Sequence, residues 1–305
     1  MRQKHGQNFL IDLNIANNII KAAELTKEDF VLEIGPGKGV LTKLIEPKAG
    51  RLIAVEIDRE LADNLSKHFS DKNNVEIINA DALKLQLAVS SEKLVVNDTV
   101  VKPSPLAGED ARRAGEGFAV NYSLLTAHYS LPLKVISNLP YNVGTAIIQK
   151  ILPLNSWSQC VFMLQKEVAA RLAATTGSKG SKGSKGSKAS KASKDYGYIS
   201  IFTQYYAECE ILFDVSPSCF NPPPQVMSSV IKLTNKRPPV PSKALFDLVK
   251  HSFSMRRKTI LNSLSSFFNI EKSEALKILQ ACNIDQMTRP DKLTLQDFIN
   301  LSKTE

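Results

Sequence analysis

The chain has 305 residues, 43% of them hydrophobic, and is therefore long enough to bury the cores of one large and one small domain. Its apolar runs are shorter than a membrane span and its first residues lack a signal-peptide pattern, so we expect a cytoplasmic protein that does not enter membranes. The net charge of +9 favours a polyanionic partner, but six lysines lie in one repeat at residues 177–194, and without them the charge is +3.

The four cysteines and four histidines are dispersed along the chain. None of them shows the close Cys and His spacing that is typical of a zinc site or of a disulfide framework. We therefore expect no metal and no disulfide bonds.

Near the N-terminus, residues 7–10 precede an amphipathic helix predicted over residues 13–25. Taken alone, these four residues indicate a turn before the helix, in which Phe9 is an apolar staple. Residues 26–29 are polar and lead into the first predicted strand.

An apolar run at residues 31–34 leads into a loop with glycines at three alternate positions, Gly35, Gly37 and Gly39. Because glycine lacks a Cβ, the backbone can adopt positive φ and approach a bound ligand closely. The pattern Glu-x-Gly-x-Gly-x-Gly differs from the dinucleotide pattern and resembles the first motif of Rossmann-like methyltransferases, whose S-adenosylmethionine lies across the loop. The alternative is a tight strand-to-helix turn that binds no ligand.

Two further strands, predicted over residues 51–58 and 75–82, also end in acids. Glu56 lies 19 positions beyond Gly37, where a carboxylate can accept hydrogen bonds from both ribose hydroxyls of a nucleoside. Asp58 competes for this role, but it can also cap the helix that follows. Asp81 can accept a bond from the exocyclic amine of the cofactor's adenine, or it can cap a helix.

From about residue 88 to 131 the sequence shows no period, and proline and glycine clusters interrupt any element. We interpret this stretch as an insertion. A strand resumes at residues 133–137 and delivers Asn138, Leu139, Pro140 and Tyr141 at its end.

This tetrapeptide suits methyl transfer to an adenine amine, which is a weak nucleophile because its lone pair is delocalised into the ring. The side-chain oxygen of Asn138 and the backbone carbonyl of Leu139 can each accept one N–H, which turns the lone pair toward an electrophilic methyl group. Tyr141 can stack on the base. A sulfonium is already a potent methyl donor, so proximity and alignment supply most of the rate. The alternative is a strand followed by an Asn-x-Pro turn.

Residues 158–165 predict a fifth strand and residues 166–172 the start of a helix. The Ser-Lys repeat at 177–194 cannot bury a core and predicts a solvated loop. Residues 198–206 and 209–213 predict two strands that form a hairpin at the sheet edge.

A proline-stiffened loop then presents Phe220, either as a stacking platform for a base or as an apolar plug. The last strand is predicted over residues 228–233. Beyond it, apolar residues recur at helical spacing, so we predict a methyltransferase domain at 1–237 and a helical domain at 238–305. The join between the first two helices exposes the basic run Arg256, Arg257 and Lys258, which either contacts phosphates or forms a solvated helix end.

With these pieces assembled, the chain closely resembles the family of ribosomal RNA adenine dimethyltransferases that modify the small-subunit RNA. The matching segments follow the family order over nearly the whole chain: residues 7–10, 33–39, 56–58, 81–82, 138–142, 165–172, 220–226 and 253–264. The resemblance implies an α/β fold, with a Rossmann-like methyltransferase sheet, helices on both faces and a small C-terminal helical domain.

The resemblance also implies a site and a substrate. The methyl-donor site is expected at Asn8, Leu10, Gly35, Glu56, Asp81 and Asn138, with Gly37 in the same loop. Phe220 becomes a stacking partner of the target adenine. The reaction implied is dimethylation of two adjacent adenines in a hairpin near the 3′ end of the small-subunit (16S) RNA, and we expect a monomer acting on a ribosomal precursor.

The chain departs from the family pattern at the two insertions and at Val143 and Gly144, which replace an Ile-Ser pair. We expect these departures to affect the rate of methyl transfer and the access of the RNA substrate more than the fold. The nearest rival function is that of a large-subunit methyltransferase of the macrolide-resistance type, against which Leu139 and the basic run argue. A non-catalytic ribosome-assembly factor is a second rival, although it would not need Asn138 and Tyr141, and a DNA adenine methyltransferase is a third.

Overall fold

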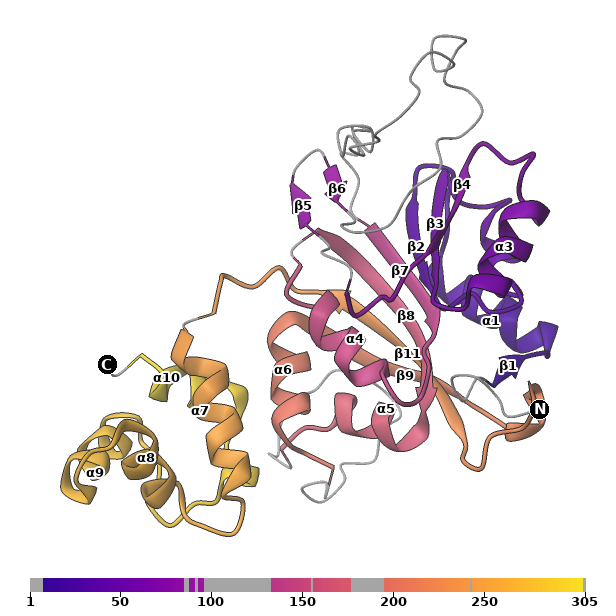
Figure 1. Cartoon of the computed structure of the whole chain (residues 1–305). Coiled ribbons are helices and arrows are strands. Elements are labelled where there is room, and N and C mark those ends of the chain that lie inside the picture. Colours follow the sequence, from indigo (N-terminus) through magenta and orange to yellow (C-terminus); the bar gives the residue numbers. More distant parts are fainter. Residues whose placement is uncertain are drawn as a thin grey trace. The chain divides into compact units, whose positions relative to one another are not determined.

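The structure is a computed structural model, and it describes residues 8–84, 88–90, 93–95, 133–154, 156–176, 195–241 and 243–303. Contacts divide the chain into two compact units (Figure 1). The first comprises residues 1–166 and 211–235, and the second comprises residues 167–210 and 236–305. The domain boundary predicted after residue 237 stays a prediction.

A seven-stranded sheet has the order β4-β3-β2-β7-β8-β11-β9 (Figure 1). Its strands are β2 (Phe30–Ile34), β3 (Arg51–Glu56), β4 (Val75–Asn79), β7 (Leu133–Asn138), β8 (Trp157–Gln165), β9 (Ala207–Val215) and β11 (Ser228–Asn235). Neighbouring strands from β4 to β8 in this order pair in parallel, and β11 runs antiparallel to β8. The chain runs from β2 outward to β4 and then returns to β7 on the other side of β2, so the strand order reverses there. Parallel sheets bind ligands at such a switch point, beyond the carboxyl ends of the strands.

The helices of the first unit are α1 (Leu13–Ala23), α2 (Thr42–Ile45), α3 (Arg59–His68) and α4 (Gly144–Ile151). The apolar stripe of α1, with Ala16, Ile19 and Ile20 buried, packs on β8 and β11 and closes the core against the sheet. The backbone N–H groups of Glu60 and Leu61 donate to Asp58, so the predicted cap of α3 is confirmed.

A two-stranded sheet pairs β1 (Phe9–Leu10) with β10 (Phe220–Asn221). The turn predicted before the first helix is therefore wrong, because residues more than two hundred positions away supply a partner strand. The backbone N–H of Ile11 extends the contact by donating to the carbonyl of Cys219 at 2.8 Å, next to the short helix η4 (Pro217–Cys219). We call this pair of strands the strap.

The second unit is helical. Its elements are α5 (Lys166–Ala173), whose first residue belongs to the first unit, α6 (Tyr198–Tyr206), α7 (Lys243–Ser254), α8 (Ile260–Phe268), α9 (Lys272–Ala281), η5 (Pro290–Lys292) and α10 (Leu295–Leu301). The C-terminal helices predicted from apolar spacing are confirmed, and Leu245, Leu248, Ile260, Leu264 and Leu279 are buried.

The strand predicted over residues 198–206 is wrong, since this segment is helix α6. Its β-branched and aromatic residues favour a strand, and because seven of its nine residues are buried, no polar face marks the helical period. The Ser200 hydroxyl accepts a bond from the backbone N–H of Gly197, and the Thr203 hydroxyl donates to the carbonyl of Ile199, so both polar side chains are satisfied inside the helix. The predicted edge hairpin is consequently wrong as well, and β9 pairs with β11 instead.

The insertion predicted from residue 88 contains a short antiparallel pair, β5 (Ala88–Ser90) and β6 (Lys93–Val95). The rest of that stretch and the lysine repeat at 177–194 lie outside the described residues. Within the described ranges, no helix has both the length and the apolar character needed to cross a membrane.

Candidate active site

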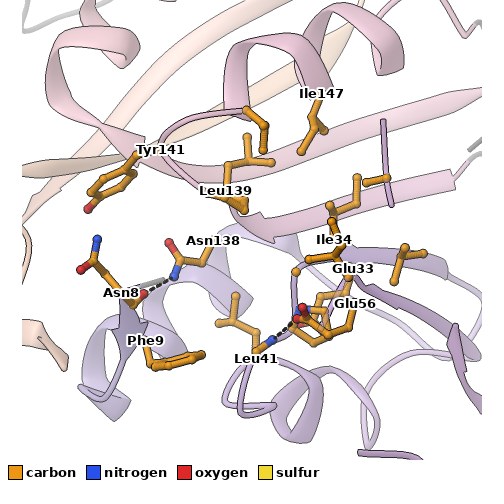
Figure 2. A pocket seen from close by; sticks show the side chains of 18 of the residues that line it. Asn8, Phe9, Glu33, Ile34, Leu41, Glu56, Asn138, Leu139, Tyr141 and Ile147 are labelled. Carbon is orange, nitrogen blue, oxygen red and sulfur yellow. Dashed lines mark hydrogen bonds between the residues drawn. The ribbon is translucent and has the colours of Figure 1, made fainter. Parts of the chain in front are cut away.

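One pocket at the carboxyl ends of the parallel strands gathers the predicted cofactor residues and, apart from Phe220, the predicted catalytic residues (Figure 2). Its lining includes every residue predicted to hold the cofactor, namely Asn8, Leu10, Gly35, Gly37, Glu56, Asp81 and Asn138. Leu139, Pro140 and Tyr141 line it as well. The strap contributes Phe9 and Leu10, and Asn8 directly precedes it, so a segment remote in sequence forms part of the wall.

The glycine loop between β2 and α2 forms the floor of the pocket. Gly37 has a φ of 58°, which favours glycine, and a Cβ at this position would meet the Phe9 ring at 3.0 Å. The Phe9 ring lies against Gly37 on one side, and the ammonium group of Lys38 lies 4.9 Å from its centroid. The strap therefore rests directly on the loop through Phe9.

Glu56 ends β3 and is 2% exposed. One carboxylate oxygen accepts the backbone N–H of Gly37 at 2.9 Å, and the other accepts the backbone N–H of Asp58 at 2.9 Å. Each oxygen keeps a lone pair, because a carboxylate has about four acceptor sites. The carboxylate is thus held in place by two backbone donors and can still accept two hydroxyl donors from a ligand.

Glu33 is a site residue that sequence reasoning missed, although it opens the glycine motif. It is 1% exposed and lines the pocket. Burial raises the pKa of Glu33 to about 8, and the negative charge of Glu56 contributes to the rise. Its Oε2 atom is buried without a hydrogen-bond partner among the described residues, so the pocket contains one polar atom that a ligand or water can satisfy.

At the third acidic position, Asp81 lines the pocket and accepts the backbone N–H of Leu83 at 2.9 Å, in the turn that follows β4. Two apolar side chains lie at the same ends of β3 and β4, Ile57 at 46% exposure and Leu83 at 37%. Both line the pocket. An apolar surface beside a carboxylate suits a planar base that carries an amine.

Asn138 is the last residue of β7, and its Nδ2 donates to the backbone carbonyl of Asn8 at 3.3 Å (Figure 2). A carbonyl oxygen can only accept, so the amide nitrogen must face Asn8 and Oδ1 must face the other way. The backbone N–H of the next residue, Leu139, donates to Met163 at 2.9 Å and continues the β7–β8 pairing. Asn8 and the sheet together hold Asn138 with its acceptor oxygen presented.

Tyr141 follows in the turn between β7 and α4, half-buried at the pocket edge. A hydrogen bond of 2.6 Å joins its hydroxyl to that of Ser228. Burial raises the pKa of Tyr141 above its ordinary value.

The structure does not bring Phe220 to the pocket. Its side chain is 3% exposed, packs in the core and sits opposite Leu10 in the strap. This arrangement matches an apolar plug. The stacking of Phe220 on a target base stays a prediction.

The predicted RNA-binding residues Arg256, Arg257 and Lys258 are exposed between α7 and α8 of the second unit. Arg256 donates to the backbone carbonyl of Tyr196 at 3.2 Å and lies 6.0 Å from the centroid of the Phe253 ring. These contacts engage the Arg256 guanidinium, while Arg257 and Lys258 are exposed beside it. In the part of the chain that the structure describes, no group of three His, Cys, Asp or Glu side chains could hold a metal ion.

Comparison with known proteins decides the family. The family model for ribosomal RNA adenine dimethylase matches residues 1–303. The chain belongs to this family. It is 38% identical to the ribosomal RNA small subunit methyltransferase A of Alkaliphilus metalliredigens, covering 98% of this chain and 89% of that protein. The ribosomal RNA small subunit methyltransferase A of Moorella thermoacetica is 35% identical, covering 99% of this chain and 92% of that protein.

Solved structures confirm the predicted fold. A dimethyladenosine transferase from Plasmodium falciparum superposes with a TM-score of 0.67 at 22% identity, covering 96% of this chain and 95% of that one. The 23S rRNA methyltransferase ErmE superposes with a TM-score of 0.61 at 21% identity, covering 97% and 98%. The mixed sheet with flanking helices is thus the Rossmann-like methyltransferase fold of the adenine dimethylase family.

The cofactor of this family member is S-adenosylmethionine, and the pocket fits it. The unpaired Oε2 of Glu33 can receive an ammonium group, and the free lone pairs of Glu56 can receive ribose hydroxyls. Ile57 and Leu83 offer apolar surface for the adenine next to Asp81. The residues that would hold it are therefore those of the glycine loop and of the ends of β3 and β4.

Proposed function

We propose that this protein dimethylates the exocyclic amines of two adjacent adenines in a hairpin near the 3′ end of small-subunit (16S) ribosomal RNA, during ribosome biogenesis. The observation that carries the proposal is the orientation of Asn138, whose amide nitrogen is engaged by Asn8 so that its oxygen is free to accept. The relatives named ribosomal RNA small subunit methyltransferase A support the small subunit as the substrate.

We assign a role in this reaction to five residues of the pocket. Glu56 binds the ribose and Asp81 the adenine amine of the cofactor, which supplies a methyl group on a positively charged sulfur. Asn138 Oδ1 and the carbonyl of Leu139 accept the two N–H bonds of the target amine and direct its lone pair at that methyl group. Tyr141 stacks on the target base.

The same acceptors serve both rounds of methylation. As the C–N bond forms, the methyl–sulfur bond breaks and the amine becomes cationic, so its proton leaves to water without a strong protein base. The monomethylated amine keeps one N–H, and one of the two acceptors is then sufficient to orient it. Asn138 and Leu139 lie at the end of the same strand, so they can share this task without rearranging.

We further propose that the substrate is a precursor of the small subunit, that the protein acts as a monomer in the cytoplasm, and that the helical domain at 238–305 binds RNA. The exposed charges of Arg256, Arg257 and Lys258 suit phosphate contacts. Such contacts make binding weaken with salt, because each neutralised phosphate releases counterions.

The test is methyl transfer from tritiated S-adenosylmethionine to isolated small subunits that lack the modification. We expect label in dimethyladenosine at two adjacent positions of the 3′ hairpin. Large subunits and duplex DNA, offered in parallel, should remain unlabelled. Label confined to large-subunit RNA or to DNA would overturn the proposed substrate, and tight small-subunit binding without any label would indicate the non-catalytic factor.

A further inference from the structure

We propose that Ser228 is the positioning residue for Tyr141, holding the ring where it meets the target base. The inference rests on the proposed function, because it assumes that Tyr141 stacks on an adenine. Ser228 contributes to the reaction through Tyr141 and does not line the pocket itself.

Tyr141 needs a contact beyond its own turn to hold its ring in place. Its Cα lies in the turn between β7 and α4, and its side chain is only half-buried, so the turn alone leaves the ring free to rotate about two torsions. A bond at the far end of the ring fixes both torsions at once. The 2.6 Å bond to Ser228 is such a bond.

Ser228 is held firmly by the sheet. It begins β11, is fully buried and lies opposite Gln165 of β8 in a register that continues to Thr234 opposite Gln159. The backbone N–H of Lys166 donates to the carbonyl of the preceding residue, Met227, at 2.9 Å. The hydroxyl of Ser228 therefore extends from a hydrogen-bonded strand, and Ser228 is 87 positions along the chain from the tyrosine that it contacts.

Ser228 differs from the neighbouring serine in the residue that it contacts. The adjacent Ser229 is 1% exposed and also bonds a side chain, Asp214, at 2.6 Å. The two serines are thus matched in burial and in hydrogen bonding, but of the two only Ser228 reaches a residue of the pocket. Ser229 therefore provides a control for any general effect on the strand.

The experiment is a double-mutant cycle over Ser228→Ala, Tyr141→Phe and the double variant, with Ser229→Ala as the matched control. Methyl transfer to small subunits is measured in single turnover, and S-adenosylmethionine binding is measured by calorimetry. Each single variant should slow transfer about tenfold, since each removes the same hydrogen bond, and the double variant should be no slower than either. Ser229→Ala should transfer at the parent rate, and cofactor affinity should stay within about twofold in all four variants.

A second readout does not depend on activity. In protein labelled with fluorotyrosine, the ¹⁹F resonance of Tyr141, assigned by its loss in Tyr141→Phe, should shift in Ser228→Ala and remain in place in Ser229→Ala. Because Tyr141→Phe removes the same hydrogen bond from its half-buried end, its slower transfer still tests the bond if Ser228→Ala folds poorly.

The outcomes separate the two proposals. A parent protein without activity on small subunits overturns the proposed function and this inference with it. An active parent with Ser228→Ala at full rate, or with the two single effects multiplying in the double variant, overturns the role of Ser228 alone. An unmoved Tyr141 resonance in Ser228→Ala also overturns it.

Discussion

The two halves of the pocket are built in different ways. In the cofactor half, Glu56 is held by the backbone N–H groups of Gly37 and Asp58, which are 19 and 2 positions away in sequence. In the base half, Asn138 is held by Asn8, 130 positions away, and Tyr141 by Ser228, 87 positions away. The Glu56 carboxylate is thus held within one β-loop-α-β unit, whereas Asn138 and Tyr141 are held by the N-terminal segment and by β11.

This difference suggests that binding and chemistry can be separated by mutation. In the proposed reaction, the cofactor half contacts parts of S-adenosylmethionine that do not react, so changes there should alter cofactor affinity. Asn138 and Leu139 are proposed to accept from the amine whose charge changes in the transition state, so changes in the base half should alter the rate.

The largest effect is expected for Asn138→Ala. Removing one acceptor from the reacting amine should lower the methyl-transfer rate by about 10²–10³-fold, the loss typical of one oriented polar group at a reacting centre. The rate is measured in single turnover, with RNA binding followed by filter retention and cofactor binding by calorimetry. RNA binding should persist. Incorporation of tritium equal to that of the parent protein would refute the catalytic role of Asn138.

The cofactor half was also the more predictable one. Apolar runs that end in Glu56 and Asp81 indicate parallel strands, and the glycine spacing after residues 31–34 indicates the loop that precedes them, because each signal lies within a few residues. The contacts of Asn138 and Tyr141 have no local signal. The identity of the residue at 138 indicates the chemistry, but the partners that orient it become neighbours only through the tertiary fold.

The lack of a local signal also explains the predictions that were wrong or missing. Residues 198–206 are apolar and aromatic on nearly every side, so burial hides the helical period and propensity favours the wrong element. Residues 9–10 are too short to show a strand pattern, and their partner Phe220 is remote. Glu33 opens the glycine motif, but the motif alone does not separate a ligand-binding carboxyl from one that is buried in a strand.

The next largest effect is expected for Glu56→Gln, which changes the cofactor half alone. Both carboxylate oxygens accept backbone N–H groups, so an amide necessarily turns an NH₂ group toward one of those donors. We expect the dissociation constant for S-adenosylmethionine to rise by about tenfold or more, with a smaller change in the rate at saturating cofactor. Glu76→Gln, at a carboxylate that bonds Arg51 outside the pocket, is the matched control and should bind cofactor normally. Equal affinities for the two variants would contradict the ribose-binding role.

Glu33→Gln tests whether the buried Glu33 carboxyl makes the free energy of unfolding depend on pH. Between its ordinary pKa of 4.5 and the folded pKa of about 8, the unfolded chain has released the Glu33 proton while the folded protein keeps it. Folding then takes up a proton, so the free energy of unfolding falls as pH rises, by up to about 1.4 kcal/mol per pH unit. Glutamine cannot titrate and removes this slope, so the variant should gain stability relative to the parent from pH 5 to pH 8. Urea unfolding across this range measures the difference, and parallel curves would show that Glu33 ionises normally.

The smallest effect is expected for Asp58→Ala, two residues beyond Glu56. Asp58 accepts the N–H groups of Glu60 and Leu61 as the cap of α3, so its loss should lower the free energy of unfolding by about 1 kcal/mol. Alanine keeps the backbone N–H that donates to Glu56, and the pocket lining does not include Asp58. Cofactor affinity should therefore stay within about twofold of the parent, as measured by calorimetry beside Glu56→Gln. A large loss of affinity would mean that Asp58 shares the ribose contact.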